Sequence, residues 1–190
     1  LPRGAMTHSA VLLIDLGTPV TPTAPALRKY LKQFLWDPRV VELPRPLWWL
    51  VLNGVILNTR PKQSAEKYAK VWTPEGSPLK VHTERQAKLL RGYLGQSGQG
   101  DLVIDWAMRY GEPSIETSLR KLAGQGITRV TFAPLYPQFA DSTTTTALVE
   151  AQRVIAAHQL PIKLSVLQPF FAQPEYLDAL AASVKPYLEH

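Results

Sequence analysis

Apolar residues gather in four short runs along the chain, near residues 11–16, 102–108, 130–135 and 163–167. The runs are rich in β-favouring side chains, which is typical of buried strands. Between them, apolar residues recur at helical spacing in residues 23–36, 64–72, 82–94, 113–122 and 141–158, and again in 174–188. Strands that alternate with helices predict an α/β fold: a doubly wound, mainly parallel four-stranded sheet flanked by helices. Residues 40–43 are expected to form a short extended piece.

The stretch 128–147 carries the clearest signal for a binding loop. Pro134 and Pro137 stop the strand, and Asp141 or Ser142 can cap the helix that follows. Loops of this kind line the crevice at the carboxyl ends of parallel strands, where ligands bind. Threonines fill residues 143–146 although β-branched residues are mediocre helix formers. Their presence therefore indicates a role other than helix propensity.

Residues 44–62 form the most unusual segment, because residues 47–57 are apolar nearly all round. The segment is too short to cross a bilayer, which needs about 20 residues. Two interpretations stay open. One is a buried helix; the other is an exposed apolar flap beside a pocket or against a membrane surface, flanked by Arg45, Arg60 and Lys62.

Composition and motifs exclude several classes of function. The chain has no cysteine, which rules out disulfides, thiolate metal sites and a cysteine nucleophile and fits a reducing compartment. The net charge is +6, but the basic residues are scattered, so no nucleic-acid partner is expected. Glycine motifs for dinucleotides, for P-loops and for a nucleophile elbow are absent. The four histidines are not spaced as metal ligands, so no metal site is predicted.

Residues at the predicted strand ends should converge on one crevice. They are Leu16, Arg109, Tyr110, Tyr136 and Phe139. Together they offer an apolar wall, aromatic faces and one guanidinium, which suits a large flat apolar ligand that carries carboxylates. From the residues alone, Arg109 fits equally well an ion pair with an acidic neighbour such as Glu112 or Asp141.

Six stretches, in order, resemble the ferrochelatase family, whose members insert ferrous iron into protoporphyrin to make haem. They are V-L-L-I-D-L-G-T-P (11–19), D-P-R-V-V-E-L-P (37–44), R-P-K-Q-S-A-E-K-Y (60–68), G-S-P-L (76–79), A-M-R-Y-G-E-P-S-I (107–115) and P-L-Y-P-Q-F-A-D-S-T-T-T-T (134–146). The similarity runs from residue 10 to about residue 180. It implies an N-terminal chelatase-like domain at 10–187 with a pocket lip at 44–62. Residues 1–9 are expected to be a protease-site remnant and linker, residues 188–190 a tag remnant, and the second, catalytic domain to be absent.

The resemblance also implies roles for individual residues. The positions implied to bind the porphyrin are Leu16, Arg60, Tyr68, Ser77, Arg109, Tyr136 and Phe139. Phe139 stands where many relatives carry tyrosine, so a hydroxyl is missing there. The lip, which in the family is implicated in membrane contact, is represented by Leu47, Trp48, Trp49 and Val51.

The resemblance implies protoporphyrin IX as the partner and Fe²⁺ as a substrate of the full enzyme. Some relatives hold an iron–sulfur cluster, but residues 140–142 read A-D-S and the chain has no cysteine, so no cluster and no bound cofactor are expected. The family's catalytic histidine, in an S-x-H-[SG]-x-P motif, and its catalytic acid have no counterpart in this sequence. No catalytic residue is therefore assigned, and the chain alone is expected to be inactive.

Three alternatives remain at this stage: a coproporphyrin-specific chelatase, a non-catalytic tetrapyrrole-binding or carrier module, and an unrelated doubly wound domain whose lip is a dimer interface. The expected location is the cytoplasm, peripheral to the inner face of the membrane. Apolar surface left uncovered by a missing domain is expected to allow an artificial dimer.

Overall fold

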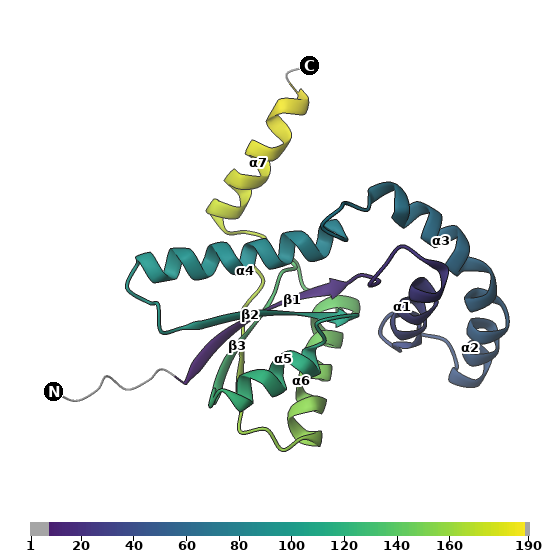
Figure 1. Ribbon diagram of the computed structural model, residues 1–190, viewed down its shortest axis with the longest axis horizontal. Helices are drawn as coiled ribbons and strands as arrows, with labels where there is room; N and C mark the ends of the chain where they lie inside the picture. Colours follow the sequence, from purple (N-terminus) through teal and green to yellow (C-terminus); the bar gives the residue numbers. More distant parts are fainter. Residues whose placement is uncertain (1–7, 189–190) are drawn as a thin grey trace.

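The computed structural model describes residues 8–188 and places helices on both faces of a parallel sheet (Figure 1). The strands are β1 (Ser9–Gly17), β2 (Val103–Tyr110), β3 (Arg129–Pro134) and β4 (Lys163–Val166). Their order in the sheet is β2-β1-β3-β4, and every pairing is parallel. The predicted four-stranded parallel α/β sheet is confirmed.

The alternation of side chains along β1 divides the core between the two faces of the sheet. Leu12 and Ile14 belong to the cluster that includes residues of α5 (Ile115–Gly124) and α6 (Thr146–Ala157). Leu13 belongs to the cluster that includes Ala87 of α4 (Pro78–Gln96). Because helices cover both faces of the sheet, the sequence of β1 is a continuous run of mostly apolar residues.

Three further helical segments form a lobe beyond the carboxyl end of β1 (Figure 1). They are α1 (Ala24–Trp36), α2 (Arg45–Val51) and α3 (Leu57–Val71), with a π-helical turn, η1 (Leu52–Ile56), between α2 and α3. α1 packs on α3 through a cluster that includes Leu27, Tyr30 and Ala65. The lobe therefore sits where ligands of open parallel sheets bind.

The extended piece predicted at residues 40–43 is wrong. The backbone N–H groups of Val40 and Val41 both donate to the Asp37 carbonyl, each at 3.1 Å, and close a turn after α1. The Asp37 side chain also accepts from the Arg39 N–H at 2.9 Å. Aspartate stabilises turns by bonding to the backbone two residues ahead, and this local bond outweighs the β propensity of the valines.

The last helix, α7 (Pro174–Leu188), projects away from the sheet (Figure 1). It continues through Pro186, and none of its residues is buried.

Candidate functional site

The register of the sheet brings the predicted strand-end residues together. Gly17 of β1 lies opposite Tyr110 of β2, and Ile14 lies opposite Pro134 of β3. The pairing of β1 with β3 extends by one bond, in which the Leu135 N–H donates to the Ile14 carbonyl at 2.9 Å. Leu16, Tyr110 and Tyr136 therefore lie at neighbouring carboxyl ends of three strands or just beyond them. We call this edge, with the residues that pack on it, the strand-end floor.

Glycine is required at the end of β1. Gly17 has a φ of +114°, and a Cβ atom there would lie 1.7 Å from the Tyr110 carbonyl oxygen. Gly111 at the end of β2 is similar, with a φ of +97° and a Cβ position 2.6 Å from the Thr18 carbonyl oxygen. At each of the two glycines, the neighbouring strand-end backbone lies so close that no side chain fits.

A buried carboxylate joins three distant segments beneath this edge. Asp37, at the end of α1, accepts hydrogen bonds at Oδ2 from Arg109 Nη2 at 2.8 Å, from the Tyr110 hydroxyl at 3.0 Å and from the Thr146 hydroxyl. Arg109 Nε also donates to the Thr146 hydroxyl at 2.9 Å and to its carbonyl at 3.1 Å. These bonds connect the end of α1, the end of β2 and the start of α6.

The electrostatics of this network favour an ionised Asp37. Burial raises the pKa of the Asp37 carboxyl, but the hydrogen bonds from Thr146, the Arg39 N–H and Tyr110, together with the Arg109 charge, outweigh burial and leave the pKa below its usual range. Burial is also the main reason that the pKa of Tyr110 rises to about 12. Asp37 therefore neutralises Arg109, whose side chain is 18% exposed.

Aromatic rings from the lobe cover the end of β2. Phe34 meets Tyr110 edge to face with ring centroids 5.3 Å apart, and Tyr30 stacks on Phe34 at 6.1 Å. The Tyr30 hydroxyl donates to the Gly17 carbonyl at 3.2 Å. Leu16 and Tyr68 pack against the same cluster and stay partly exposed, so apolar surface remains open at the floor.

The Tyr136 hydroxyl is unusual, because it is shielded from water and has no hydrogen-bond partner among the described residues. Burial raises the pKa of this hydroxyl, and the nearby Asp15, Tyr110 and Tyr30 raise it further. An unpaired buried hydroxyl costs about 1–3 kcal/mol. Unpaired buried polar groups are rare in folded proteins, so the fold alone does not explain this hydroxyl.

Comparison with known proteins adds independent evidence. The family model described as Ferrochelatase matches residues 8–190. Proteins named ferrochelatase from Chromobacterium violaceum and Stutzerimonas stutzeri are 55% and 54% identical over 96% and 97% of this chain. One from Aromatoleum aromaticum is 52% identical over 98% of the chain.

The chain belongs to the ferrochelatase family. It spans about half the length of the curated relatives it matches, since the aligned part covers 50–52% of these three proteins.

The structure brings some of the predicted porphyrin-binding residues together and separates others. Leu16, Tyr68, Arg109 and Tyr136 lie at or next to the strand-end floor. Ser77 is buried, and its hydroxyl accepts a 2.8 Å hydrogen bond from Thr18, just beyond β1. Two residues stand apart from this cluster: Arg60 is exposed on α3, and Phe139 is 60% exposed on the loop after β3.

Arg109 has an acidic partner, but not one of those that the sequence suggested. Its carboxylate is Asp37, 72 positions away, rather than Glu112 or Asp141. The Glu112 side chain instead accepts from the Ser114 N–H at 2.9 Å, and Asp141 accepts from the Thr145 hydroxyl at 2.7 Å. The interpretation of Arg109 as a member of an ion pair is therefore confirmed, but the suggested partners, Glu112 and Asp141, are wrong.

The structure accounts for most of the unusual threonine run. The hydroxyls of Thr143, Thr145 and Thr146 donate to the Ala140 carbonyl, to Asp141 and to Asp37, respectively. A π-helical turn, η2 (Asp141–Thr145), precedes α6. The predicted capping by Asp141 or Ser142 is wrong: Ala140 holds the N-cap position, and its carbonyl accepts from the Thr143 and Thr144 N–H groups.

The two tryptophans of the predicted lip have opposite environments. Trp48 is 7% exposed, clusters with Leu52 and Leu57, and donates through Nε1 to the Leu35 carbonyl at 2.7 Å. Its assignment to an exposed lip is wrong, because helical periodicity turns it toward α1. Trp49 is 54% exposed, as is Leu47 at 55%, whereas Val51 packs partly against the Trp48 cluster.

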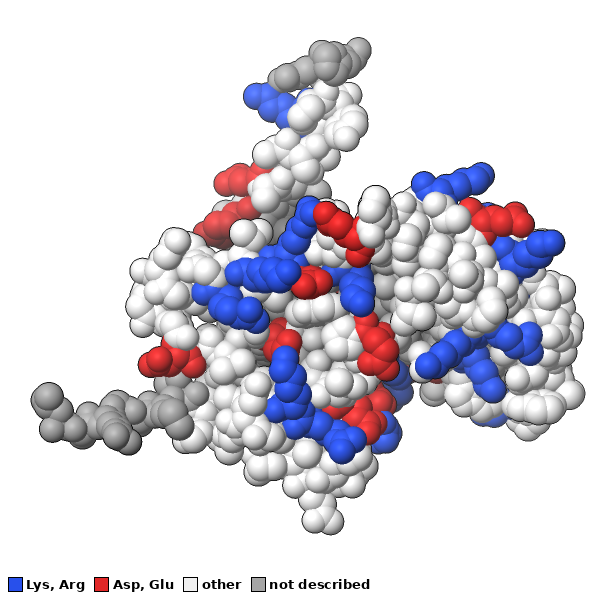
Figure 2. All heavy atoms as spheres, in the orientation of Figure 1, with Lys and Arg blue, Asp and Glu red and all other residues white. Residues whose placement is uncertain are grey.

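Charged side chains of both signs are intermixed on the face shown in Figure 2. In the part of the chain that the structure describes, no helix is both long and apolar enough to traverse a bilayer.

Proposed function

We propose that this chain supplies the porphyrin-binding half of a ferrochelatase cleft, in which Fe²⁺ is inserted into protoporphyrin IX to make haem. The observation that carries the proposal is the buried, unpaired Tyr136 hydroxyl beside an aromatic strand-end floor. Family membership supports the reaction class. The floor supports the ligand class, because flat apolar ligands are held by aromatic faces with a few polar contacts.

Arg109 and Arg60 have different roles in this proposal. Arg109 is already neutralised by Asp37, so its guanidinium serves to shape the floor. Arg60 makes no hydrogen bond or ion pair with any residue in 8–188, so its exposed guanidinium can form two parallel bonds with a porphyrin carboxylate. Because Asp37 neutralises Arg109, the strand-end floor offers apolar surface without an open cation, which favours protoporphyrin, with two carboxylates, over the more acidic coproporphyrin.

The proposal places the deprotonating base outside this chain. Metal insertion replaces two pyrrole protons, so it needs a base beside the ring nitrogens. Within residues 8–188 no group of three His, Asp or Glu side chains gathers as metal ligands. His8 bonds to the Gly126 carbonyl near the start of β1, and His158 pairs with Glu116. The chain accordingly binds and orients the porphyrin, iron is a substrate, and the 190 residues alone do not metallate the ring.

The same proposal places the protein in the cytoplasm, with the exposed apolar side chains of the lip toward the inner membrane surface. Leu47, Trp49 and Leu50 are each more than half exposed. Apolar side chains at this density on one helix suit peripheral contact with lipid.

The test is a titration of the purified chain with protoporphyrin IX, followed by tryptophan fluorescence. We expect saturable binding that Tyr136→Phe weakens about tenfold, because a lost hydrogen bond costs about 1.4 kcal/mol. Tyr187, which is 83% exposed on α7, gives the matched control: Tyr187→Phe should bind like the wild type. Equal binding by wild type and Tyr136→Phe would contradict the proposed contact.

Two further arms of the titration separate the alternative functions. Coproporphyrin that binds tighter than protoporphyrin would favour a coproporphyrin-specific chelatase. Addition of Fe²⁺ under anaerobic conditions should leave the porphyrin spectrum unchanged, and haem formation would contradict the assignment of the base to another part of the protein.

A further inference from the structure

A separate hollow lies between α1 and α2, on a different face of α1 from the strand-end floor. Its volume is about 410 Å³, within the range of small-molecule sites. Tyr30 and Leu27 of α1 pack toward Tyr110 and the floor. The hollow is lined by another set of side chains, which are Lys29, Lys32, Gln33 and Trp36 of α1 with Trp49, Leu52 and Asn53 of α2 and its π turn.

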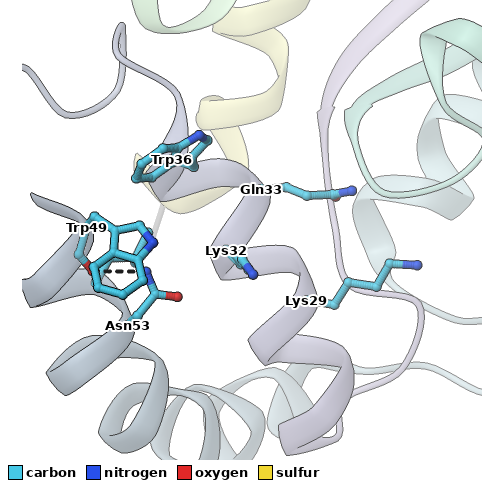
Figure 3. A pocket seen from close by; sticks show the side chains of 7 residues that line it. Lys29, Lys32, Gln33, Trp36, Trp49 and Asn53 are labelled. Carbon is cyan, nitrogen blue, oxygen red and sulfur yellow. Dashed lines mark hydrogen bonds between the residues drawn. The ribbon is translucent and has the colours of Figure 1, made fainter. Parts of the chain in front are cut away.

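Two indoles form the walls of this hollow. Figure 3 shows Trp36 of α1 and Trp49 of α2 on its two sides. Trp36 is 40% exposed and Trp49 is 54% exposed, whereas Leu52 between the helices is fully buried. Large exposed aromatic side chains that face one concave site offer an apolar ligand both rings and an aliphatic base.

The charge around the hollow has one sign. Lys29 and Lys32 form no hydrogen bond or ion pair with any described residue, and no acidic residue lines the hollow. A third cation stands next to it, because the Arg45 guanidinium lies 3.9 Å from the centroid of the Trp36 ring. In Figure 3, Lys32 lies on the side of α1 that faces Asn53, whereas Lys29 extends from the opposite edge. These positive charges favour the binding of one anionic group next to Lys32.

We infer that this α1–α2 pocket binds a soluble single-chain anionic amphiphile, such as a medium-chain carboxylate. The acyl chain lies between Trp36 and Trp49, and the carboxylate meets Lys32, with Lys29 at the rim. A half-open cavity of this volume suits one narrow chain, and its unpaired lysines suit one headgroup. This inference is independent of the porphyrin proposal, because the strand-end floor contributes none of the lining residues.

The experiment is calorimetric titration of the chain with decanoate, and with decan-1-ol as the uncharged match. We expect decanoate to bind at one site at least tenfold more tightly than the alcohol, and added salt to weaken it. Lys32→Gln should weaken decanoate binding about tenfold. The matched control is Lys67→Gln on α3, which is exposed and does not line the pocket, and it should leave binding unchanged.

A second variant tests the apolar wall. Trp49→Ser removes an indole that is half exposed, so the fold should persist, as circular dichroism and the urea unfolding curve will show. Decanoate affinity should nevertheless fall about tenfold in this variant. A chain saturated with decanoate should still bind protoporphyrin IX with unchanged affinity.

Several outcomes would overturn the inference. These are no decanoate binding, equal binding of acid and alcohol, an equal loss in Lys67→Gln, and displacement of decanoate by protoporphyrin. Binding to anionic vesicles without binding to decanoate would also overturn it, since that pattern indicates a lipid surface rather than a pocket. Failure of decanoate with retained porphyrin binding would leave the proposed function untouched.

Discussion

The strand-end floor and the lip differ in how their side chains are held. In the floor, Asp37, Arg109, Tyr110 and Thr146 hold one another through hydrogen bonds between segments far apart in the sequence. In the lip, one stripe around Trp48 is buried, while Leu47, Trp49, Leu50 and Val55 face solvent. The difference separates side chains that the fold holds in place from side chains that remain exposed.

Individual positions in each region break that pattern. In the floor, the Tyr136 hydroxyl is buried without a partner among residues 8–188, which costs stability. In the lip, Trp48 is structural although it is adjacent to the exposed Trp49. Variants at these positions, and at those that hold them in place, test whether the floor and the lip differ as described.

The largest expected effect is that of Gly17→Ala, which attacks the floor directly. The new Cβ would overlap the Tyr110 carbonyl, and the residue would keep a positive φ, so we expect a loss of more than about 5 kcal/mol in the free energy of unfolding. Gly124→Ala in α5 is the control, because nothing lies within 4 Å of its Cβ position. Urea unfolding measures both, and similar curves would contradict the packing described for the floor.

The next effect compares the two lip tryptophans. Trp48→Ala should cost about 3–5 kcal/mol through a cavity and an unmet Leu35 carbonyl, because Trp48 is buried. Trp49→Ala should change stability by no more than about 0.5 kcal/mol. Thermal or urea unfolding of the pair decides this, and equal losses would show that the lip is packed in solution in a different way.

A loss of about 3 kcal/mol is expected for Asp37→Ala. The substitution leaves the partly buried Arg109 charge without its partner and removes the acceptor of the Tyr110 and Thr146 hydroxyls. Asp178→Ala on the exposed face of α7 provides the control and should leave the unfolding free energy nearly unchanged. If both variants unfolded alike, the network would not hold the floor together.

The smallest expected effect is on the stability of the fold at low pH. The pKa of Asp37 is lower in the folded chain than the ordinary value of about 3.9, so its ionised form stabilises the fold above that value. This stabilisation is lost as the pH falls from the ordinary pKa through the folded one. Asp37→Asn should therefore show a flatter loss of stability below about pH 4 than the wild type. If the free energy of unfolding fell in parallel in the two proteins below about pH 4, that result would contradict an ionised Asp37.

The sequence predicts the sheet well because a strand buried on both faces leaves a continuous apolar run. It also places Leu16, Arg109 and Tyr136 at one edge, since the carboxyl ends of parallel strands meet there. Helix boundaries were less predictable: α4 begins four residues before the expected start at residue 82, and the π-helical turns of η1 and η2 leave no clear pattern.

The partner of Arg109 could not be predicted, because a pairing across 72 positions depends on the tertiary fold. Asp37 belongs to the stretch D-P-R-V-V-E-L-P, and its role as the partner of Arg109 depends on how β2 and α6 are placed around it. The run of threonines marked Thr146 as unusual in the sequence. Its role, a hydrogen bond to Asp37, depends on the tertiary fold. The burial of Trp48 was hidden because the segment is apolar on every side, so its sequence does not show which side faces α1.

The most direct test of the central claim is an absorbance titration of the chain with protoporphyrin IX, comparing the wild type with Arg60→Gln, Lys62→Gln and Trp49→Ser. Arg60 and Lys62 are both exposed, two positions apart, so each variant removes one positive charge from the same helix. We expect saturable binding that Arg60→Gln weakens about tenfold, while Lys62→Gln and Trp49→Ser leave it unchanged. Absence of saturable binding, or binding that is lost in Trp49→Ser and kept in Arg60→Gln, would contradict a porphyrin site at the strand-end floor.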